Sequence, residues 1–129
     1  IWGLAFKPNT DDIREAPALY IIPELIKLGA KVICYDPEAI ANTQSFFKSF
    51  HPEIADQIAY GDNAYDILIN ANALAICTEW SIFRTPDLEK VKANLADKVI
   101  FDGRNLFDLE SMKEAGFYYN SIGRSIVPA

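Results

Sequence analysis

Short apolar runs alternate with amphipathic segments along the whole chain. The apolar runs lie at residues 1–6, 31–35, 58–60, 73–77, 99–101 and 117–122. The segments between them are expected to be helical at residues 16–28, 38–50, 63–72, 85–95 and 109–115. Strands that alternate with helices form a parallel sheet through right-handed crossovers. The pattern therefore predicts one three-layer α/β domain over residues 1–129, with a mainly parallel sheet of about five strands and helices on both faces.

Individual residues place the ends of these elements. Asp11 or Asp12 is a suitable N-cap for the first helix, and Gly29 is a suitable stop for it. Pro23 falls inside that helix, where a proline removes a hydrogen bond and is expected to introduce a kink. Residues 78–80 are expected to lead from the most apolar interior strand into a loop.

Composition and charge narrow the classes of partner. The 129 residues are 50% hydrophobic, which is enough for a core, and their net charge of −6 opposes a general attraction to nucleic acid or anionic membrane. No apolar run approaches the roughly 18 residues of a membrane span, and no signal peptide is present. Cys34 and Cys77 lie within apolar runs, which is typical of buried, reduced thiols in a cytoplasmic protein. The chain begins without Met, so we expect it to be a piece of a longer protein.

The turn after the first strand carries two cations. Lys7 stands where that strand is predicted to end, and Arg14 follows a polar stretch at residues 10–12. Ligands of parallel α/β sheets bind at the carboxyl ends of strands, so this turn is a candidate site for an anionic small molecule. The alternative is that Lys7 is simply solvated and that Arg14 pairs with Asp11 or Glu15.

A dinucleotide site within this chain is not favoured. Gly3 is the only glycine of the first strand and turn, whereas close approach to a pyrophosphate requires a G-x-G-x-x-G array. Asp36, at the end of the second strand, occupies the usual place of a ribose-binding acid, but it is better explained as a cap of the Asp36–Pro37 turn. We therefore predict a Rossmann-like topology without an autonomous dinucleotide site.

Two further strand ends carry chemically useful side chains. Glu79 and Trp80 follow one strand, and Arg104 lies in the loop at residues 102–105 after another. Because the carboxyl ends of parallel strands share one rim, Lys7, Glu79, Trp80 and Arg104 are expected to converge there. The alternative for residues 102–105 is a simple turn, since Asp-Gly favours turns.

No catalytic or metal-binding constellation is visible. Cys77 lies inside a strand without a neighbouring base, and His51, the single histidine, precedes Pro52 at an expected exposed junction. We assign no catalytic residue and no metal, and we expect a ligand-binding domain.

Three ordered segments resemble the C-terminal, UDP-binding domain of the UDP-glucose/GDP-mannose dehydrogenase family. They are Gly3–Glu15, Ile76–Trp80 and Phe101–Asn105, and Tyr35–Pro37 and Gly116–Gly123 also fit. The resemblance covers essentially the whole chain. Within the family, the Thr-Glu-Trp and Asp-Gly-Arg-Asn segments are most similar to those of the UDP-glucose members.

This resemblance implies a parent enzyme that oxidises UDP-glucose to UDP-glucuronate by two hydride transfers to NAD, through a thioester on a catalytic cysteine. The cysteine and the main NAD site would belong to N-terminal and central domains outside this chain, so the fragment alone is expected to be inactive. Phe6, Lys7 and Arg104 are then expected to bind the substrate, and Arg14 to reach the NAD. The parent would be a cytoplasmic homo-oligomer serving polysaccharide biosynthesis.

Two alternatives remain open. The first is the same domain of a dehydrogenase for UDP-N-acetylmannosamine or GDP-mannose. The second is a stand-alone α/β nucleotide-binding module in which Lys7 and Arg14 are merely solvated.

Overall fold

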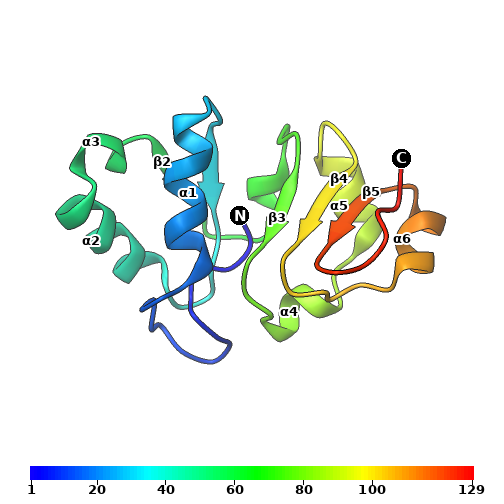
Figure 1. Cartoon of the computed structure of the whole chain (residues 1–129), viewed down its shortest axis with the longest axis horizontal. Helices are drawn as coiled ribbons and strands as arrows, with labels where there is room; N and C mark the ends of the chain where they lie inside the picture. The colour runs from blue at the N-terminus through cyan, green and yellow to red at the C-terminus, as the bar shows by residue number, and fades with distance from the viewer.

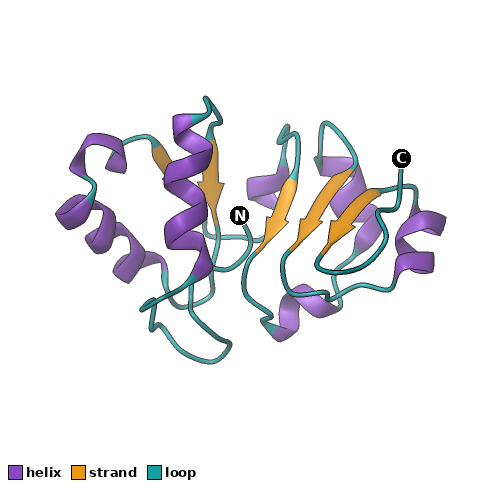
Figure 2. Cartoon of the chain, in the orientation of Figure 1, coloured by secondary structure: helices purple, strands orange, loops and turns teal.

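The computed structural model covers residues 1–129 and has the α/β organisation that the sequence predicts (Figures 1 and 2). The strands are β1 (Val32–Cys34), β2 (Ile58–Tyr60), β3 (Leu74–Ile76), β4 (Val99–Asp102) and β5 (Tyr118–Ser121). The helices are α1 (Pro17–Lys27), α2 (Ile40–Phe50), α3 (Pro52–Ala55), α4 (Ser81–Arg84), α5 (Leu88–Asn94) and α6 (Leu109–Ala115), and a 3-10 turn, η1, spans Asp66–Leu68. None of these helices is long and apolar enough to cross a membrane.

The five strands form two parallel sheets that share a neighbour at the start of the chain. One sheet has the order β1-β2 and the other the order β3-β4-β5. Trp2 forms a parallel bridge to Tyr35 on one side and to Ile76 on the other. Backbone hydrogen bonds from Trp2 N to Ala75 O (2.8 Å) and from Gly3 N to Tyr35 O (2.9 Å) complete this junction. The prediction of a mainly parallel sheet is confirmed, with the opening segment at its centre.

Trp2 also anchors the core beneath this junction. Its ring stacks on Phe83 at a centroid distance of 4.9 Å, and its indole nitrogen donates to Ala64 O at 2.8 Å. Both rings are buried, so the indole loses water but keeps a partner for its N–H group. The core thus extends directly from the central segment of the sheet.

Helices lie on both faces of the sheet as a whole, with α1 in front of β1 and α5 behind β4 in Figure 1. The two faces of β3–β5 differ in burial. Ile100 and Tyr119 lie on a fully buried face, whereas Ala75, Phe101 and Asn120, which are aligned in register, lie on the opposite face. Phe101 is 45% exposed there, so this part of the second face is incompletely covered.

Two predicted elements are shorter than expected. The first strand does not extend to Phe6, because the backbone turns at Gly3 (φ 103°) and the next two amides, of Leu4 and Ala5, donate to a side chain instead of a strand. The predicted helix at residues 63–72 is wrong except for η1. No helix begins at residue 63, because the Asn63 side chain accepts hydrogen bonds from the amides of Tyr65 and Asp66 and holds them in a turn.

Two further local predictions are wrong. Neither Asp11 nor Asp12 caps the first helix, because α1 begins at Pro17 with Ala16 as an N-cap that has no side-chain hydrogen bond. The loop predicted after Trp80 contains the short helix α4. Gly29 does follow the end of α1, with a positive φ of 94°.

The two cysteines behave as the sequence predicts. Cys34 and Cys77 are both free and buried. Burial raises the pKa of the Cys34 thiol to about 12 and that of the Cys77 thiol to about 11. Neither thiol is therefore suited to act as a nucleophile near neutral pH.

Candidate functional site

The carboxyl ends of the strands meet at one edge of the molecule, which we call the rim. In Figure 1 the visible strand arrows point to the lower edge, where α4 and the loops after Gly3 and Asp102 lie. The loop after Gly3 is joined to the segment that follows β3, because the buried Thr78 hydroxyl donates to Ala5 O at 2.6 Å. The loop after β4 is joined to the end of β3 through the amide of Gly103, which donates to Ile76 O at 2.9 Å.

Asp36 is the centre of the rim. Its side chain is 2% exposed, and five donors surround its carboxylate. Oδ2 accepts from Leu4 N (2.8 Å), Ala5 N (3.0 Å) and Trp80 Nε1 (3.0 Å). Oδ1 accepts from Glu38 N and Ala39 N, both at 2.9 Å. The turn cap predicted from the sequence is thus present, and the carboxylate also joins three separate segments of chain.

This arrangement leaves no room for a ribose at Asp36. A dinucleotide-binding acid must offer free carboxylate oxygens, whereas both oxygens of Asp36 are already bound by the protein. Gly3 likewise serves packing: a Cβ at this position would lie 2.5 Å from both the backbone nitrogen and the Cβ of Thr78. Asp36 and Gly3 therefore both serve the packing and hydrogen bonding of the rim.

Of the four residues predicted to converge at the rim, Glu79 and Arg104 contact each other, whereas Trp80 binds Asp36 and Lys7 forms no hydrogen bond or ion pair with any of them. Glu79 Oε2 accepts from Arg104 Nε at 3.1 Å and from Arg104 Nη2 at 2.5 Å. Burial by itself would raise the pKa of Glu79, but the hydrogen bond and positive charge of Arg104 outweigh it and the pKa is lowered. The Arg104 side chain remains 40% exposed, so it is both held and accessible.

The loop that carries Arg104 is fixed by Asp102. Asp102 is 1% exposed, and its carboxylate accepts from Arg104 N (2.9 Å) and Leu106 N (2.7 Å). Tyr119 also donates its hydroxyl to Asp102 Oδ2 at 2.5 Å. Burial, reinforced by this hydrogen bond, raises the pKa of Tyr119 to about 12. Residues 102–105 therefore form a turn, as the Asp-Gly pair favours, and this turn also places Arg104 at the rim.

Arg124 completes this network and was not singled out from the sequence. Its Nη2 donates to the Tyr119 oxygen at 2.8 Å, its Nη1 to Phe107 O and its Nε to Ser121 Oγ, the last two at 2.9 Å. The pattern could not have revealed Arg124, since its role depends on bringing Tyr119 and Ser121 of β5 together with Phe107 of the loop before α6.

Phe6 and Lys7 lie in the loop after the central segment and face solvent. Phe6 is 50% exposed, although its amide donates to Asp12 O at 2.8 Å and closes the loop. Lys7 is exposed and forms no ion pair in the chain. Its ammonium is therefore available to an anion that reaches this loop.

Arg14 pairs with a different carboxylate from Arg104. Its Nη2 lies 2.7 Å from Asp12 Oδ2, its Nε donates to both oxygens of the same carboxylate, and its side chain is 87% exposed. Hydrogen bonds from Arg14 hold the pKa of Asp12 at about 2. Local pairing, anticipated with Asp11 or Glu15, occurs instead with Asp12.

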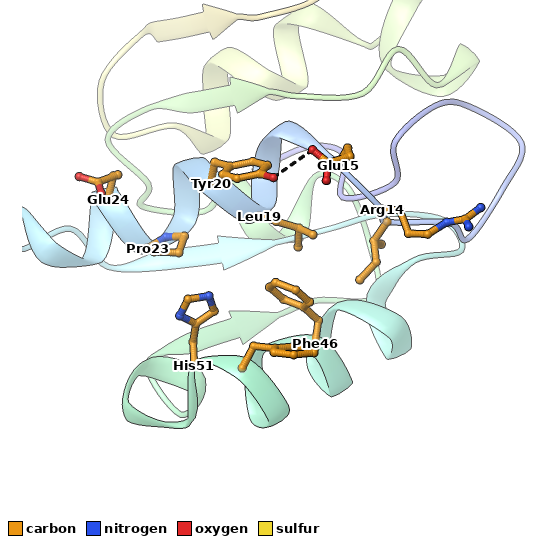
Figure 3. A pocket seen from close by; sticks show the side chains of 10 residues that line it. Arg14, Glu15, Leu19, Tyr20, Pro23, Glu24, Phe46 and His51 are labelled. Atoms are coloured by element: carbon orange, nitrogen blue, oxygen red, sulfur yellow. Dashed lines mark hydrogen bonds between the residues drawn. The ribbon is translucent and has the colours of Figure 1, made fainter.

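Arg14 also borders a groove of about 770 Å³ between α1 and α2 (Figure 3). Leu19 faces Phe46 and His51 across this groove, whereas the Arg14 guanidinium points away from these rings. His51, expected to be exposed, is only partly so, with a side-chain exposure of 37%. The groove contains neither Lys7 nor Arg104, so its size does not make it the anion site.

The rim and the parallel strand order together define a Rossmann-like domain. The chain belongs to the UDP-glucose/GDP-mannose dehydrogenase family: the model of the family's UDP-binding domain matches residues 1–109.

Curated relatives agree with this assignment. The chain is 46% identical over 127 residues to the UDP-glucose 6-dehydrogenase TuaD of Bacillus subtilis, covering 98% of this chain and 26% of that protein. It is 40% identical over 126 residues to the UDP-glucose 6-dehydrogenase of Pseudomonas aeruginosa, covering 96% of this chain and 27% of that protein. The chain thus spans about a quarter of the length of the relatives that it matches.

Solved structures agree as well. A UDP-glucose dehydrogenase from Pyrobaculum islandicum superposes with a TM-score of 0.73 at 27% identity, over 96% of this chain and 24% of that one. A UDP-D-ManNAc dehydrogenase from Pyrococcus horikoshii superposes with a TM-score of 0.69 at 28% identity, over 95% of this chain and 24% of that one.

Proposed function

We propose that residues 1–129 form the UDP-sugar-binding domain of an NAD-dependent UDP-glucose dehydrogenase, which oxidises UDP-glucose to UDP-glucuronate. The observation that carries this proposal is the rim of a chain of the UDP-binding-domain family, where Lys7 is exposed in the loop after Gly3 and Arg104 is exposed in the loop after β4. The curated relatives at 40–46% identity are UDP-glucose 6-dehydrogenases, which favours UDP-glucose as the sugar nucleotide. A UDP-N-acetylmannosamine enzyme is the second candidate, because such a dehydrogenase is among the similar structures.

The proposed role of this chain is to bind and orient. Lys7 supplies a point charge and Arg104 a planar fork for the diphosphate, and Phe6 supplies an exposed ring for the remainder of the nucleotide. Binding energy from the UDP then holds the sugar in place for chemistry on another domain. The catalytic cysteine belongs outside this chain, since Cys34 and Cys77 are buried with raised pKa values.

NAD would be bound mainly by an N-terminal domain and would accept the hydride there. The parent would include that domain and a central one, and we propose that it is a cytoplasmic homo-oligomer. A cleft closed between domains excludes water, which strengthens the charge contacts made by the rim. Arg14 would be this chain's contact to NAD, since its Nη1 atom has no partner in the protein and its side chain is 87% exposed.

Lys7→Ala and Arg104→Ala are each expected to weaken UDP binding about tenfold, because each removes a charge-assisted contact to phosphate. Isothermal titration of the complete protein with UDP and with GDP measures this loss and the preference for uracil. Lys48→Ala, an exposed lysine on α2, is the control and should bind UDP normally. Unchanged UDP affinity in both rim variants would contradict the site.

Arg14→Ala is expected to raise the KM for NAD about fivefold and to change the KM for UDP-glucose less than about twofold. The reason is that Arg14 pairs with Asp12 and takes no part in the Glu79–Arg104 pair, and that it is exposed beside the groove. Steady-state kinetics with each substrate varied separately distinguish the two effects, and Arg14→Lys should recover part of the NAD affinity. An effect confined to UDP-glucose would reverse the assignment of Arg14.

A further inference from the structure

Glu79 lies between two residues that are fixed within the rim. Thr78 donates its hydroxyl to Ala5 O, and Trp80 donates its indole N–H to Asp36 Oδ2 at 3.0 Å. Thr78 is fully buried and Trp80 is 8% exposed. The backbone of Glu79 therefore cannot move without breaking buried hydrogen bonds on both sides.

The Glu79 carboxylate is bound on one oxygen only. Both of its hydrogen bonds from Arg104, at 3.1 Å and 2.5 Å, end on Oε2. Oε1 is buried and has no hydrogen-bond partner. A buried acceptor without a donor costs free energy, so the carboxylate is stabilised at the rim through Oε2 alone.

The bonds to Glu79 use one edge of the Arg104 guanidinium and leave the other free. Nε and Nη2 are occupied, whereas Nη1 donates to no protein atom. An unrestrained arginine loses considerable rotamer freedom when it binds a ligand. Holding the side chain in advance removes much of that cost from the binding step.

We propose that Glu79 is a positioning residue, which fixes Arg104 so that its free Nη1 edge meets the UDP moiety. This inference rests on the proposed function, since it assigns Arg104 to the UDP-sugar. The anchored backbone, the pair of hydrogen bonds and the unsatisfied Oε1 all belong to a residue whose purpose is to hold its neighbour. Glu79 itself makes no contact with the ligand.

The proposal predicts a non-additive pattern of UDP affinities in the complete protein. Glu79→Ala should weaken UDP binding about fivefold, because Arg104 must then be ordered by the ligand. Glu79→Gln should restore most of the affinity, since its amide oxygen still accepts from Arg104. The double variant Glu79→Ala/Arg104→Ala should bind no more weakly than Arg104→Ala alone. Glu89→Ala, an exposed glutamate of α5, is the control.

A second measurement tests the positioning without UDP. In protein labelled with ¹⁵N at arginine, the Arg104 Nε–H signal should exchange slowly with water, and Glu79→Ala should make that exchange at least about tenfold faster. Equal exchange in both proteins, or full additivity in the double variant, would overturn the positioning role. If the unmodified protein bound no UDP, the proposed function would be overturned instead, and the exchange measurement would still decide whether Glu79 holds Arg104.

Discussion

Asp36→Ala is expected to lower the free energy of unfolding by about 4 kcal/mol, since it leaves several buried donors without an acceptor. The five hydrogen bonds of this carboxylate come from residues 4–5, residues 38–39 and Trp80. Water cannot readily replace them, because the side chain is 2% exposed. Chemical denaturation followed by tryptophan fluorescence measures the change, and Trp80 reports directly on the altered site.

Asp62→Ala is the matched control for this result. Asp62 is exposed and forms no hydrogen bond through its side chain, so the free energy of unfolding should change by less than about 0.5 kcal/mol. The loss of unfolding free energy in Asp36→Asn should fall between those of Asp36→Ala and Asp62→Ala. The amide oxygen of Asn still accepts hydrogen bonds, but its NH₂ group faces backbone and indole donors. A cost for Asp36→Ala no larger than that of the control would show that the carboxylate is not the centre of the rim.

Gly3→Ala is expected to lower the free energy of unfolding by about 4 kcal/mol, from two causes that act together. The first is a backbone φ of 103°, which an L-residue adopts only with strain. The second is steric, since the new Cβ would lie 2.5 Å from the backbone nitrogen of Thr78. The loop after Gly3 would have to separate from residues 78–80, so UDP affinity should fall with stability.

Gly29→Ala separates these two causes. Gly29 has a similar φ of 94°, but nothing lies within 4 Å of a Cβ at this position. Gly29→Ala should therefore lower the free energy of unfolding only through backbone strain, by about 1 kcal/mol. Thermal or denaturant unfolding of the two variants side by side gives the steric part as the difference. Equal costs would mean that the contact between Gly3 and Thr78 relaxes freely.

The hydrophobic pattern predicts most elements because burial in a parallel sheet requires apolar runs of recognisable length. β2 and α6 have the bounds expected from the sequence, and α1 and β3 differ by a residue or so at their ends. The pattern fails at residues 4–6, which are apolar without being a strand. Leu4 and Ala5 are buried by packing at the rim, where a buried carboxylate takes the place of a neighbouring strand, whereas Phe6 is exposed.

The candidate site was predictable only as far as topology determines it. A parallel sheet brings strand ends to one edge, and the Glu79–Arg104 pair is the result. The roles of Asp102, Tyr119 and Arg124 depend on side chains that meet across the fold, which no spacing along the chain encodes. Likewise, the pairing of Arg14 with Asp12 depends on the conformation of one turn.

The opening segment has a consequence for the cooperativity of the whole domain. Trp2 is the only residue that bridges both sheets, with Tyr35 on one side and Ile76 on the other. The two-stranded and three-stranded sheets therefore share a neighbour, although they form no ladder with each other. Loss of this segment would leave each with an unpaired edge, so the two halves are expected to unfold as a single cooperative unit.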